Sequence, residues 1–156
     1  MKIGIGYDIH RLTEGRKMVL GGVKMDHPKG PAGHSDGDVL IHAICDAILG
    51  ALGMEDIGVL FPDTDPAYKD ISSIKLLRDV VNAMKERGYS VGNLDCVVIA
   101  EEPKVSPYRE EIIKVLAPVL GAGEDSVNVK GKTSEKLGAI GYGEAIAAQA
   151  VVLLEG

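Results

Sequence analysis

Several features that mark particular classes of protein are scarce in this sequence. Only two cysteines occur, Cys45 and Cys96, both in apolar stretches, so we predict buried free thiols and exclude a disulfide framework or a cysteine-rich zinc site. No apolar run is long enough to span a membrane, and residues 1–12 lack the apolar run of a signal peptide. We therefore expect a reducing compartment, the cytoplasm or an organelle matrix.

Positive charge is also in deficit. The 17 lysines and arginines are outnumbered by 23 acidic residues, and the net charge of −6 argues against nucleic acid or an anionic membrane as the main partner. A small anionic substrate remains compatible if a metal and a few cations act locally. With 156 residues and 46% hydrophobic content, we expect one domain, residues 1–156, that buries about 70% of its unfolded surface.

The apolar periodicity predicts helices interleaved with a few strands. Helices are expected over residues 36–53, from Asp70 to a stop at Gly88, and from an N-cap at Ser106 to Gly121. Strands are expected over residues 1–11, 90–100 and 126–130, a loop over 26–37, and either helix or strand over 143–154. This pattern favours an α+β domain of two layers, a mixed four-stranded sheet with helices on one face.

The first predicted strand carries two possible metal ligands. Apolar side chains alternate from Ile3 to Ile9, and we expect this face to pack on the core. The opposite face holds Gly4, Gly6, Asp8 and His10. An Asp-x-His pair alone is weak evidence, because many strands carry one whose polar groups are satisfied by hydrogen bonds.

A third possible ligand lies in the apolar helix predicted next. Asp38, His42 and Asp46 are spaced by four and form a polar stripe, which needs partners when it is buried. One interpretation is a hydrogen-bonded histidine held by the neighbouring carboxylates. The other, which we favour, is a metal on His42, with Asp38 or Asp46 orienting the ring. With Asp8 and His10, this gives two imidazoles and a carboxylate, the ligands of a divalent metal with open coordination positions.

Blocks along nearly the whole chain resemble the 2-C-methyl-D-erythritol 2,4-cyclodiphosphate synthase family. They lie at residues 4–10 (GIGYDIH), 34–42 (HSDGDVLIH), 56–58, 61–66 (FPDTDP), 102–104, 127–130 and 133–138 (TSEKLG). The resemblance implies a phosphorus–oxygen lyase of the non-mevalonate isoprenoid pathway. In that reaction the 2-phosphate of 4-diphosphocytidyl-2-C-methyl-D-erythritol 2-phosphate attacks the β-phosphorus of the same molecule, and CMP leaves. No protein nucleophile is required, so catalysis consists of positioning and charge stabilisation.

The resemblance also implies a role for individual residues. Zn²⁺ is expected on Asp8, His10 and His42, and Mg²⁺ or Mn²⁺ on Glu135 together with substrate phosphates. His34 and Thr133 match the positions that stabilise the transition state. The implied substrate-binding residues are Asp8, His10, His34, Ser35, Asp56, Ile57, Gly58, Phe61, Pro62, Asp63, Thr64, Asp65, Ala100, Glu101, Glu102, Pro103, Lys104, Val105, Ser106, Lys132, Thr133, Ser134 and Glu135. Residues 100–106 match the cytosine pocket, and Lys132 either contacts a phosphate or is exposed.

The family's assembly is implied in the same way. Its members are homotrimers with sheets packed around the threefold axis and active sites between subunits, and the family uses the tail of the chain as a strand. This resolves the ambiguity over residues 143–154 in favour of a strand, as tertiary context often does.

One departure from the family predicts a loss of binding. Many members carry Phe and Arg where this chain has Ala139 and Tyr142, at the trimer centre where isoprenoid diphosphates bind. Without the guanidinium there is no bidentate clamp for the diphosphate, so we expect weak binding. Titration with farnesyl diphosphate measures it, and tight, saturable binding would contradict the expectation.

Three other functions use the same ligand types. A non-haem iron oxygenase predicts iron and oxygen-dependent turnover, although such ligands usually lie on all-β scaffolds. A zinc phosphohydrolase predicts a linear product, which phosphorus NMR distinguishes from a cyclic diphosphate. A trimeric scaffold with a structural metal predicts that His42→Ala dissociates the trimer, whereas a catalytic site predicts a folded, inactive variant.

Overall fold

Four long strands form the framework of the fold. In the computed structural model, which describes residues 1–62 and 64–156, they are β1 (Lys2–Glu14), β5 (Ser90–Ile99), β6 (Val127–Lys132) and β7 (Ala145–Glu155). A short fifth strand, β4 (Lys29–Pro31), completes the order β4-β1-β7-β5-β6. Only the β5–β6 pair is parallel among these neighbours. The predicted mixed sheet is confirmed, but it has five strands instead of the predicted four, because β4 forms inside the expected loop and pairs with the end of β1.

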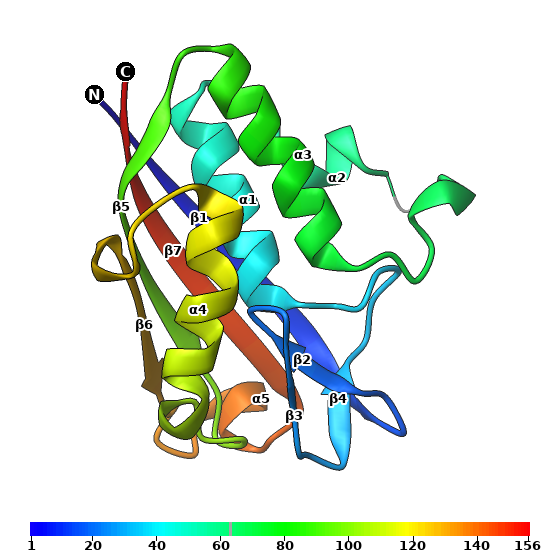
Figure 1. Cartoon of the computed structure of the whole chain (residues 1–156). Coiled ribbons are helices and arrows are strands. Elements are labelled where there is room, and N and C mark those ends of the chain that lie inside the picture. Colours follow the sequence, from blue (N-terminus) through cyan, green and yellow to red (C-terminus); the bar gives the residue numbers. More distant parts are fainter. Residues whose placement is uncertain (63) are drawn as a thin grey trace.

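Three helices cover one face of this sheet, as predicted (Figure 1). They are α1 (Val39–Ala51), α3 (Ser73–Glu86) and α4 (Arg109–Leu120), and α1 lies between the sheet and α3. Smaller elements connect them: a ribbon of β2 (Met18–Leu20) and β3 (Val23–Met25), the short helices α2 (Ile57–Leu60) and α5 (Gly138–Gly141), and the 3-10 turns η1 (Pro66–Tyr68), η2 (Ser106–Tyr108) and η3 (Glu124–Ser126).

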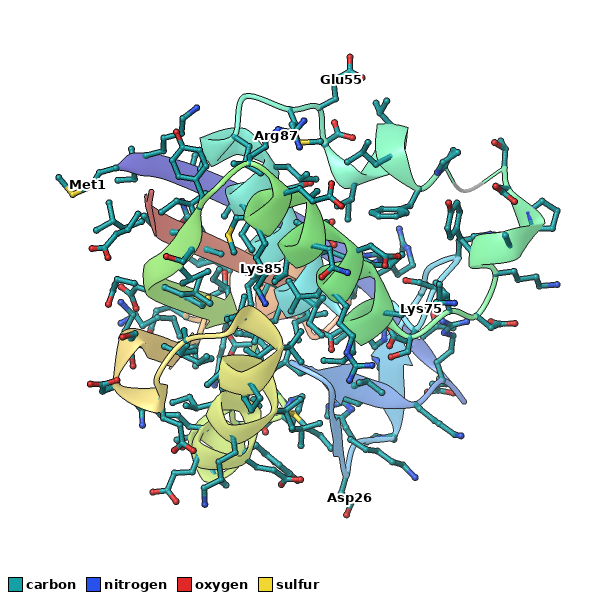
Figure 2. All side chains as sticks on the ribbon, turned by 45° about the horizontal axis from the view of Figure 1, so that its top comes forward. Met1, Asp26, Glu55, Lys75, Lys85 and Arg87 are labelled. Atoms are coloured by element: carbon teal, nitrogen blue, oxygen red, sulfur yellow. The ribbon has the colours of Figure 1, made fainter. Side chains whose placement is uncertain are left out.

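The core lies between the helices and the sheet. Leu40, Ile44 and Ile48 of α1 are completely buried, as expected for a helix that is apolar on nearly every side. Side chains fill the space between the two layers in Figure 2, while Glu55 and Asp26 extend outward at its margins. Both cysteines are buried free thiols, as predicted, and burial raises the pKa of Cys96 to about 12.

The expectation that the apolar face of β1 packs on the core is wrong for the single chain. Ile3 and Ile9 remain 71% and 47% exposed, and the glycine face turns inward instead. A Cβ atom on Gly4 would lie 1.9 Å from the Ala47 carbonyl oxygen, and one on Gly6 would lie 1.9 Å from the Ala43 oxygen. The glycines therefore let α1 lie directly on the strand backbone. Alternation shows which residues share a face, but it does not show which face the helix covers.

Local signals placed some boundaries incorrectly. The N-cap predicted at Ser106 is wrong: Ser106 opens the 3-10 turn η2 and Tyr108 is the N-cap of α4, although Gly121 ends that helix in a left-handed conformation as predicted. Residues 145–155 form β7, in agreement with the strand implied by the resemblance. Among the described residues, no helix combines the length and the apolarity that crossing a membrane would require.

Candidate metal centre and the cavities around it

Asp8 and His10 of β1 meet His42 of α1 beneath the helix layer. Asp8 Oδ2 lies 2.8 Å from His10 Nε2 and 2.9 Å from His42 Nδ1, and the two nitrogens are 3.2 Å apart. The close approach of α1 to the glycines of β1 produces this meeting, because His42 precedes Ala43 and Asp8 follows Gly6. The three predicted ligands therefore form one cluster.

The tautomer of each ring follows from its outer contact. His10 Nδ1 lies 2.5 Å from the Ala32 carbonyl oxygen, which only accepts, so Nδ1 carries the hydrogen. His42 Nε2 lies 3.0 Å from Ser73 Oγ and 3.2 Å from Ser35 Oγ. Where Nε2 carries the hydrogen, the neutral rings direct two lone pairs, from His10 Nε2 and His42 Nδ1, towards the Asp8 carboxylate.

This cluster fits a divalent cation. Two ring nitrogens and a carboxylate oxygen that face one another repel unless a positive charge lies among them. Their separations of 2.8–3.2 Å are close to the roughly 3.3 Å between ligand atoms of a tetrahedral site with bonds near 2.0 Å. Burial opposes ionisation of Asp8, but hydrogen bonds that the His10 and His42 rings donate in the metal-free chain outweigh it and lower its pKa to about 2. A bound cation would take the place of those donated hydrogens. Asp8 is thus ionised, as a ligand must be.

The prediction that Asp38 or Asp46 orients the His42 ring is wrong. Asp38 caps α1, accepting from the backbone N–H of Ile41 at 3.1 Å, and it also accepts from Gly21 and Gly22. Burial, aided by the charge of Asp36, raises its pKa to about 6 against these donors. Asp46 accepts from the Ile57 N–H at 2.9 Å, and burial raises its pKa as well. The polar stripe therefore serves three different structural purposes, and only its middle residue is a candidate ligand.

A cavity of about 290 Å³ opens beside the cluster and collects many of the other predicted residues. His34 and Ser35 come from the loop before α1, and Phe61 comes from the segment after α2. Its predicted lining is Asp8, His10, His34, Ser35, His42, Ile57, Gly58 and Phe61, to which the structure adds Gly33, Asp46, Tyr68, Ile71 and Leu76. The apolar additions lacked any signal in the sequence, because their periodicity is that of ordinary core residues.

The other predicted residues of this region that the structure describes do not line the cavity. Asp56 caps α2 through the Val59 N–H, and the Asp65 side chain caps η1 through the Ala67 N–H. The Asp65 carbonyl oxygen lies 3.3 Å from His34 Nε2, which ties the segment after α2 to the loop before α1. Pro62 and Thr64 lie in this segment, whereas the predicted contact of Asp63 lies outside the described residues.

A second cavity, of about 110 Å³, lies at the β5–β6 edge of the sheet. Its lining is Ala100, Pro103, Lys104, Val105, Ser106, Gly131, Lys132 and Thr133. Glu102 is exposed beside Lys104, with 3.8 Å between the charged atoms, and it does not line the cavity. Most residues predicted to contact a nucleotide base are therefore grouped here.

Glu101 has a structural role that the sequence did not indicate. Its Oε1 atom accepts from the backbone N–H groups of Ser134 and Lys136, at 2.9 and 3.0 Å. These bonds hold a loop in which Glu135 and Lys136 adopt left-handed backbone angles, a costly conformation that needs such support. Thr133 Oγ1 donates to Glu135 Oε1 at 3.0 Å, so the two predicted functional groups lie together.

Within one chain, the metal cluster and the residues that line the second cavity lie far apart. His10 pairs with Ile146 of β7, whereas Lys132 pairs with Ile99 of β5, which pairs in turn with Ala147. Three strand spacings, roughly 14 Å in all, therefore lie between the metal cluster on β1 and the end of β6. Each cavity holds only part of the predicted site.

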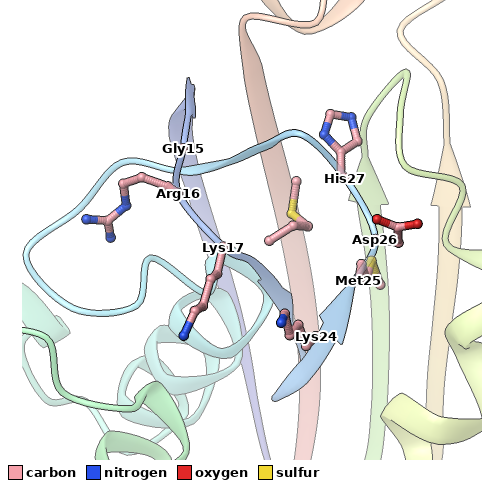
Figure 3. A pocket seen from close by; sticks show the side chains of 8 residues that line it. Gly15, Arg16, Lys17, Lys24, Met25, Asp26 and His27 are labelled. Carbon is pink, nitrogen blue, oxygen red and sulfur yellow. The ribbon is translucent and has the colours of Figure 1, made fainter.

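Figure 3 shows a larger cavity, of about 500 Å³, between the turn after β1 and the β2–β3 ribbon. Basic side chains line it, from Arg16, Lys17, Lys24 and His27. Arg16 is engaged in the structure: its Nε donates to the Pro31 oxygen at 2.9 Å and its Nη2 to the Ser35 oxygen at 3.1 Å. None of the residues predicted to carry chemistry lines this cavity, and Arg16 instead supports the loop that delivers Ser35.

Comparison with known proteins agrees with this arrangement. The model of the YgbB family matches residues 1–155. The 2-C-methyl-D-erythritol 2,4-cyclodiphosphate synthase of Clostridium acetobutylicum is 54% identical over 99% of each chain. The structure of IspF from Plasmodium falciparum in complex with CDP is 44% identical, with a TM-score of 0.86, over 98% of this chain and 94% of that one. The bifunctional IspDF of Campylobacter jejuni superposes with a TM-score of 0.94 at 40% identity, and this chain spans 42% of it.

Proposed function

This chain belongs to the YgbB family, and we propose that it converts 4-diphosphocytidyl-2-C-methyl-D-erythritol 2-phosphate into 2-C-methyl-D-erythritol 2,4-cyclodiphosphate and CMP, as a phosphorus–oxygen lyase. It forms the cyclodiphosphate in isoprenoid precursor biosynthesis, and residues 1–156 act as one synthase domain. The observation that carries the proposal is the cluster of Asp8, His10 and His42 at the mouth of a cavity large enough for a phosphorylated sugar alcohol.

Zn²⁺ suits the cluster, which offers two ring nitrogens and one carboxylate oxygen. Asp8, His10 and His42 would hold it, and when bound it supplies positive charge and an open position for a phosphate oxygen. The outer contacts of both histidines favour the tautomers that a metal needs, and Asp8 is ionised, so binding requires only that the hydrogens between the three ligands leave. A harder ion, Mg²⁺ or Mn²⁺, suits the single carboxylate of Glu135 together with phosphate oxygens of the substrate.

The chain's own residues orient the reacting groups. His34 and Ser35 border the metal cavity, where they can contact the 2-phosphate, and Ile57 and Gly58 can enclose the methylerythritol part. Holding the attacking phosphate close to the β-phosphorus fixes the geometry of attack before the reaction begins. This lowers the entropic part of the barrier and accounts for a large part of the rate enhancement. We assign to His34 and Thr133 the stabilisation of charge as the bond to CMP breaks.

The second cavity suits the cytosine base. Ala100 and residues 103–106 line it, and the backbone N–H and C=O groups of this segment can read the edge of a pyrimidine. The solved structure of a relative, IspF from Plasmodium falciparum, is a CDP complex, which supports a cytidine nucleotide as the ligand. We assign to Lys132, which lines this cavity, a contact with a phosphate of the substrate.

We further propose that the active site forms between subunits of a homotrimer. The metal cluster and the base cavity lie about three strands apart in one chain, so a site that uses both requires a second copy. The exposed apolar face of β1, from Ile3 to Ile9, provides a surface that association would bury.

Incubation of the protein with the cytidylyl substrate, Zn²⁺ and Mg²⁺ tests the reaction. The expected products are CMP, detected by chromatography, and a cyclic diphosphate, identified by phosphorus NMR. A linear phosphorylated product would indicate a phosphohydrolase instead, and the absence of CMP would refute the proposed activity.

Mixed trimers test the shared site. A His42→Ala chain retains the Glu135 loop, and a Glu135→Gln chain retains the metal cluster, so each variant alone is expected to be inactive. In a ring with heterologous contacts, random mixing of equal amounts restores about a quarter of the wild-type sites. Activity is measured after co-refolding and compared with that of the two variants refolded separately and then combined. If each site lay within one chain, co-refolding would restore no activity.

A further inference from the structure

Ser73 is a completely buried hydroxyl at the start of α3, and it lies behind the metal cluster. Its Oγ atom is 3.0 Å from His42 Nε2, on the side of the ring opposite to Asp8. Nothing in the sequence distinguished it from an ordinary residue of a helix start. Helix formation does not require a contact between this hydroxyl and a candidate metal ligand, so the contact with His42 needs another explanation.

Asp36 fixes the direction of this hydrogen bond. The Ser73 hydroxyl donates to Asp36 Oδ1 through a short hydrogen bond, and the Ser73 backbone N–H donates to Asp36 Oδ2 at 3.0 Å. A hydroxyl has one hydrogen, and here it is directed at a carboxylate. Towards His42, Ser73 Oγ can therefore only accept. The Asp8 carboxylate, 2.9 Å from Nδ1, is an acceptor as well, so a neutral His42 satisfies Ser73 only with its hydrogen on Nε2, which leaves the lone pair of Nδ1 for a cation placed between it and Asp8.

The surrounding backbone keeps this chain of contacts in place. The Asp36 N–H donates to the Ile71 oxygen at 3.1 Å, and the Asp70 N–H donates to the His34 oxygen at 2.8 Å. These bonds join the loop before α1 to the segment before α3, so Ser73 is held against His42 from a separate element. Ser35 Oγ lies slightly farther from Nε2, at 3.2 Å, and also accepts from the Gly37 N–H at 3.2 Å.

We infer that Ser73 is a positioning residue for the metal centre: with Asp36 it places the hydrogen of His42 on Nε2 and turns the lone pair of Nδ1 towards Asp8 and His10. The inference rests on the proposed function, in which the cluster binds a metal, because orienting a ligand correctly increases the affinity for that metal. Contacts of this outer kind typically change metal affinity 10- to 100-fold when they are removed.

The test compares Ser73→Ala with a matched control, Ser72→Ala. Ser72 is the preceding residue, is exposed, and makes no side-chain cap hydrogen bond at the start of the same helix. Zinc affinity is measured by competition with a chelator of known affinity. We expect Ser73→Ala to bind zinc about 10- to 100-fold more weakly than wild type and Ser72→Ala to bind it unchanged. Equal affinity of Ser73→Ala and wild type would overturn the inference.

Nitrogen-15 NMR of the full-length wild-type chain supplies a readout that does not depend on the stability of any variant. In the zinc-loaded protein we expect the hydrogen of His42 on Nε2 and in slow exchange with solvent, because Ser73 Oγ accepts it, and we expect faster exchange in Ser73→Ala. A wild-type spectrum with the hydrogen on Nδ1 would overturn the inference even if Ser73→Ala failed to fold. If wild type makes no cyclic product but Ser73→Ala still loses zinc affinity, the inference stands and the proposed function fails.

Discussion

The His42→Ala protein is expected to remain folded and to lose about a thousandfold or more in its rate of cyclodiphosphate formation, together with its tight binding of zinc. The substitution removes one of three ligand atoms. The two that remain, on Asp8 and His10, are too few to hold a divalent ion tightly. The ring is only 7% exposed and packs at the first turns of α1, but the helix keeps its Asp38 cap. The measurements are the rate of CMP release, the zinc content of the dialysed protein and the circular dichroism spectrum.

His27→Ala is the matched control for this experiment. His27 lies at the larger basic cavity, and its Nδ1 accepts only a local hydrogen bond from the Lys29 N–H at 3.0 Å. Its removal is expected to leave rate and zinc content within about twofold of wild type, as is usual for substitutions outside a site. If His42→Ala dissociated or unfolded while His27→Ala did not, the metal would be structural. A His42→Ala protein with wild-type activity would exclude the cluster from the reaction.

Gly6→Ala is expected to destabilise the protein by about 3 kcal/mol or more and to disrupt the metal cluster. The new Cβ atom would lie 1.9 Å from the Ala43 carbonyl oxygen and 2.6 Å from the Ala47 nitrogen. These are backbone atoms, which cannot rotate away as a side chain can, so α1 and β1 would have to separate by more than about an ångström. His42 moves with α1 and Asp8 with β1, so the distance between the ligands increases. Urea denaturation and zinc affinity measure the two effects.

Gly50→Ala, a substitution on the same helix, is expected to stabilise the protein instead of destabilising it. A Cβ atom at Gly50 would meet only the Ile5 oxygen, at 3.7 Å, and Gly50 lies in the last turn of α1 on the exposed side. Because alanine has less freedom than glycine in the unfolded chain, we expect a stabilisation of about 0.5–1 kcal/mol with unchanged zinc affinity. If Gly6→Ala were as stable as Gly50→Ala, the close contact of α1 with β1 would not be a determinant of the fold.

The sequence predicted the ligands and the layers because both depend on local patterns. Alternation placed Asp8 and His10 on one face of a strand, and spacing by four set His42 apart in an apolar helix. The blocks of family resemblance then predicted the segments of the two cavities. Helix ends were less accurate. The Asp38 cap makes α1 begin at Val39, three residues after the predicted start at Asp36, and the 3-10 turn η2 makes α4 begin at Arg109 instead of directly after Ser106.

Only the tertiary structure decided which partners these groups have. Alternation puts Ile3 and Gly4 on opposite faces of β1, but it does not say which face packs against α1. The glycine face does, because only glycines allow the helix backbone to approach the strand so closely. The stripe of Asp38, His42 and Asp46 is regular in sequence, yet its carboxylates bind backbone N–H groups of distant loops and its imidazole meets Ser73. Side-chain chemistry and periodicity are properties of the chain itself. A hydrogen-bond partner from another element depends on how the layers pack, which no local pattern records.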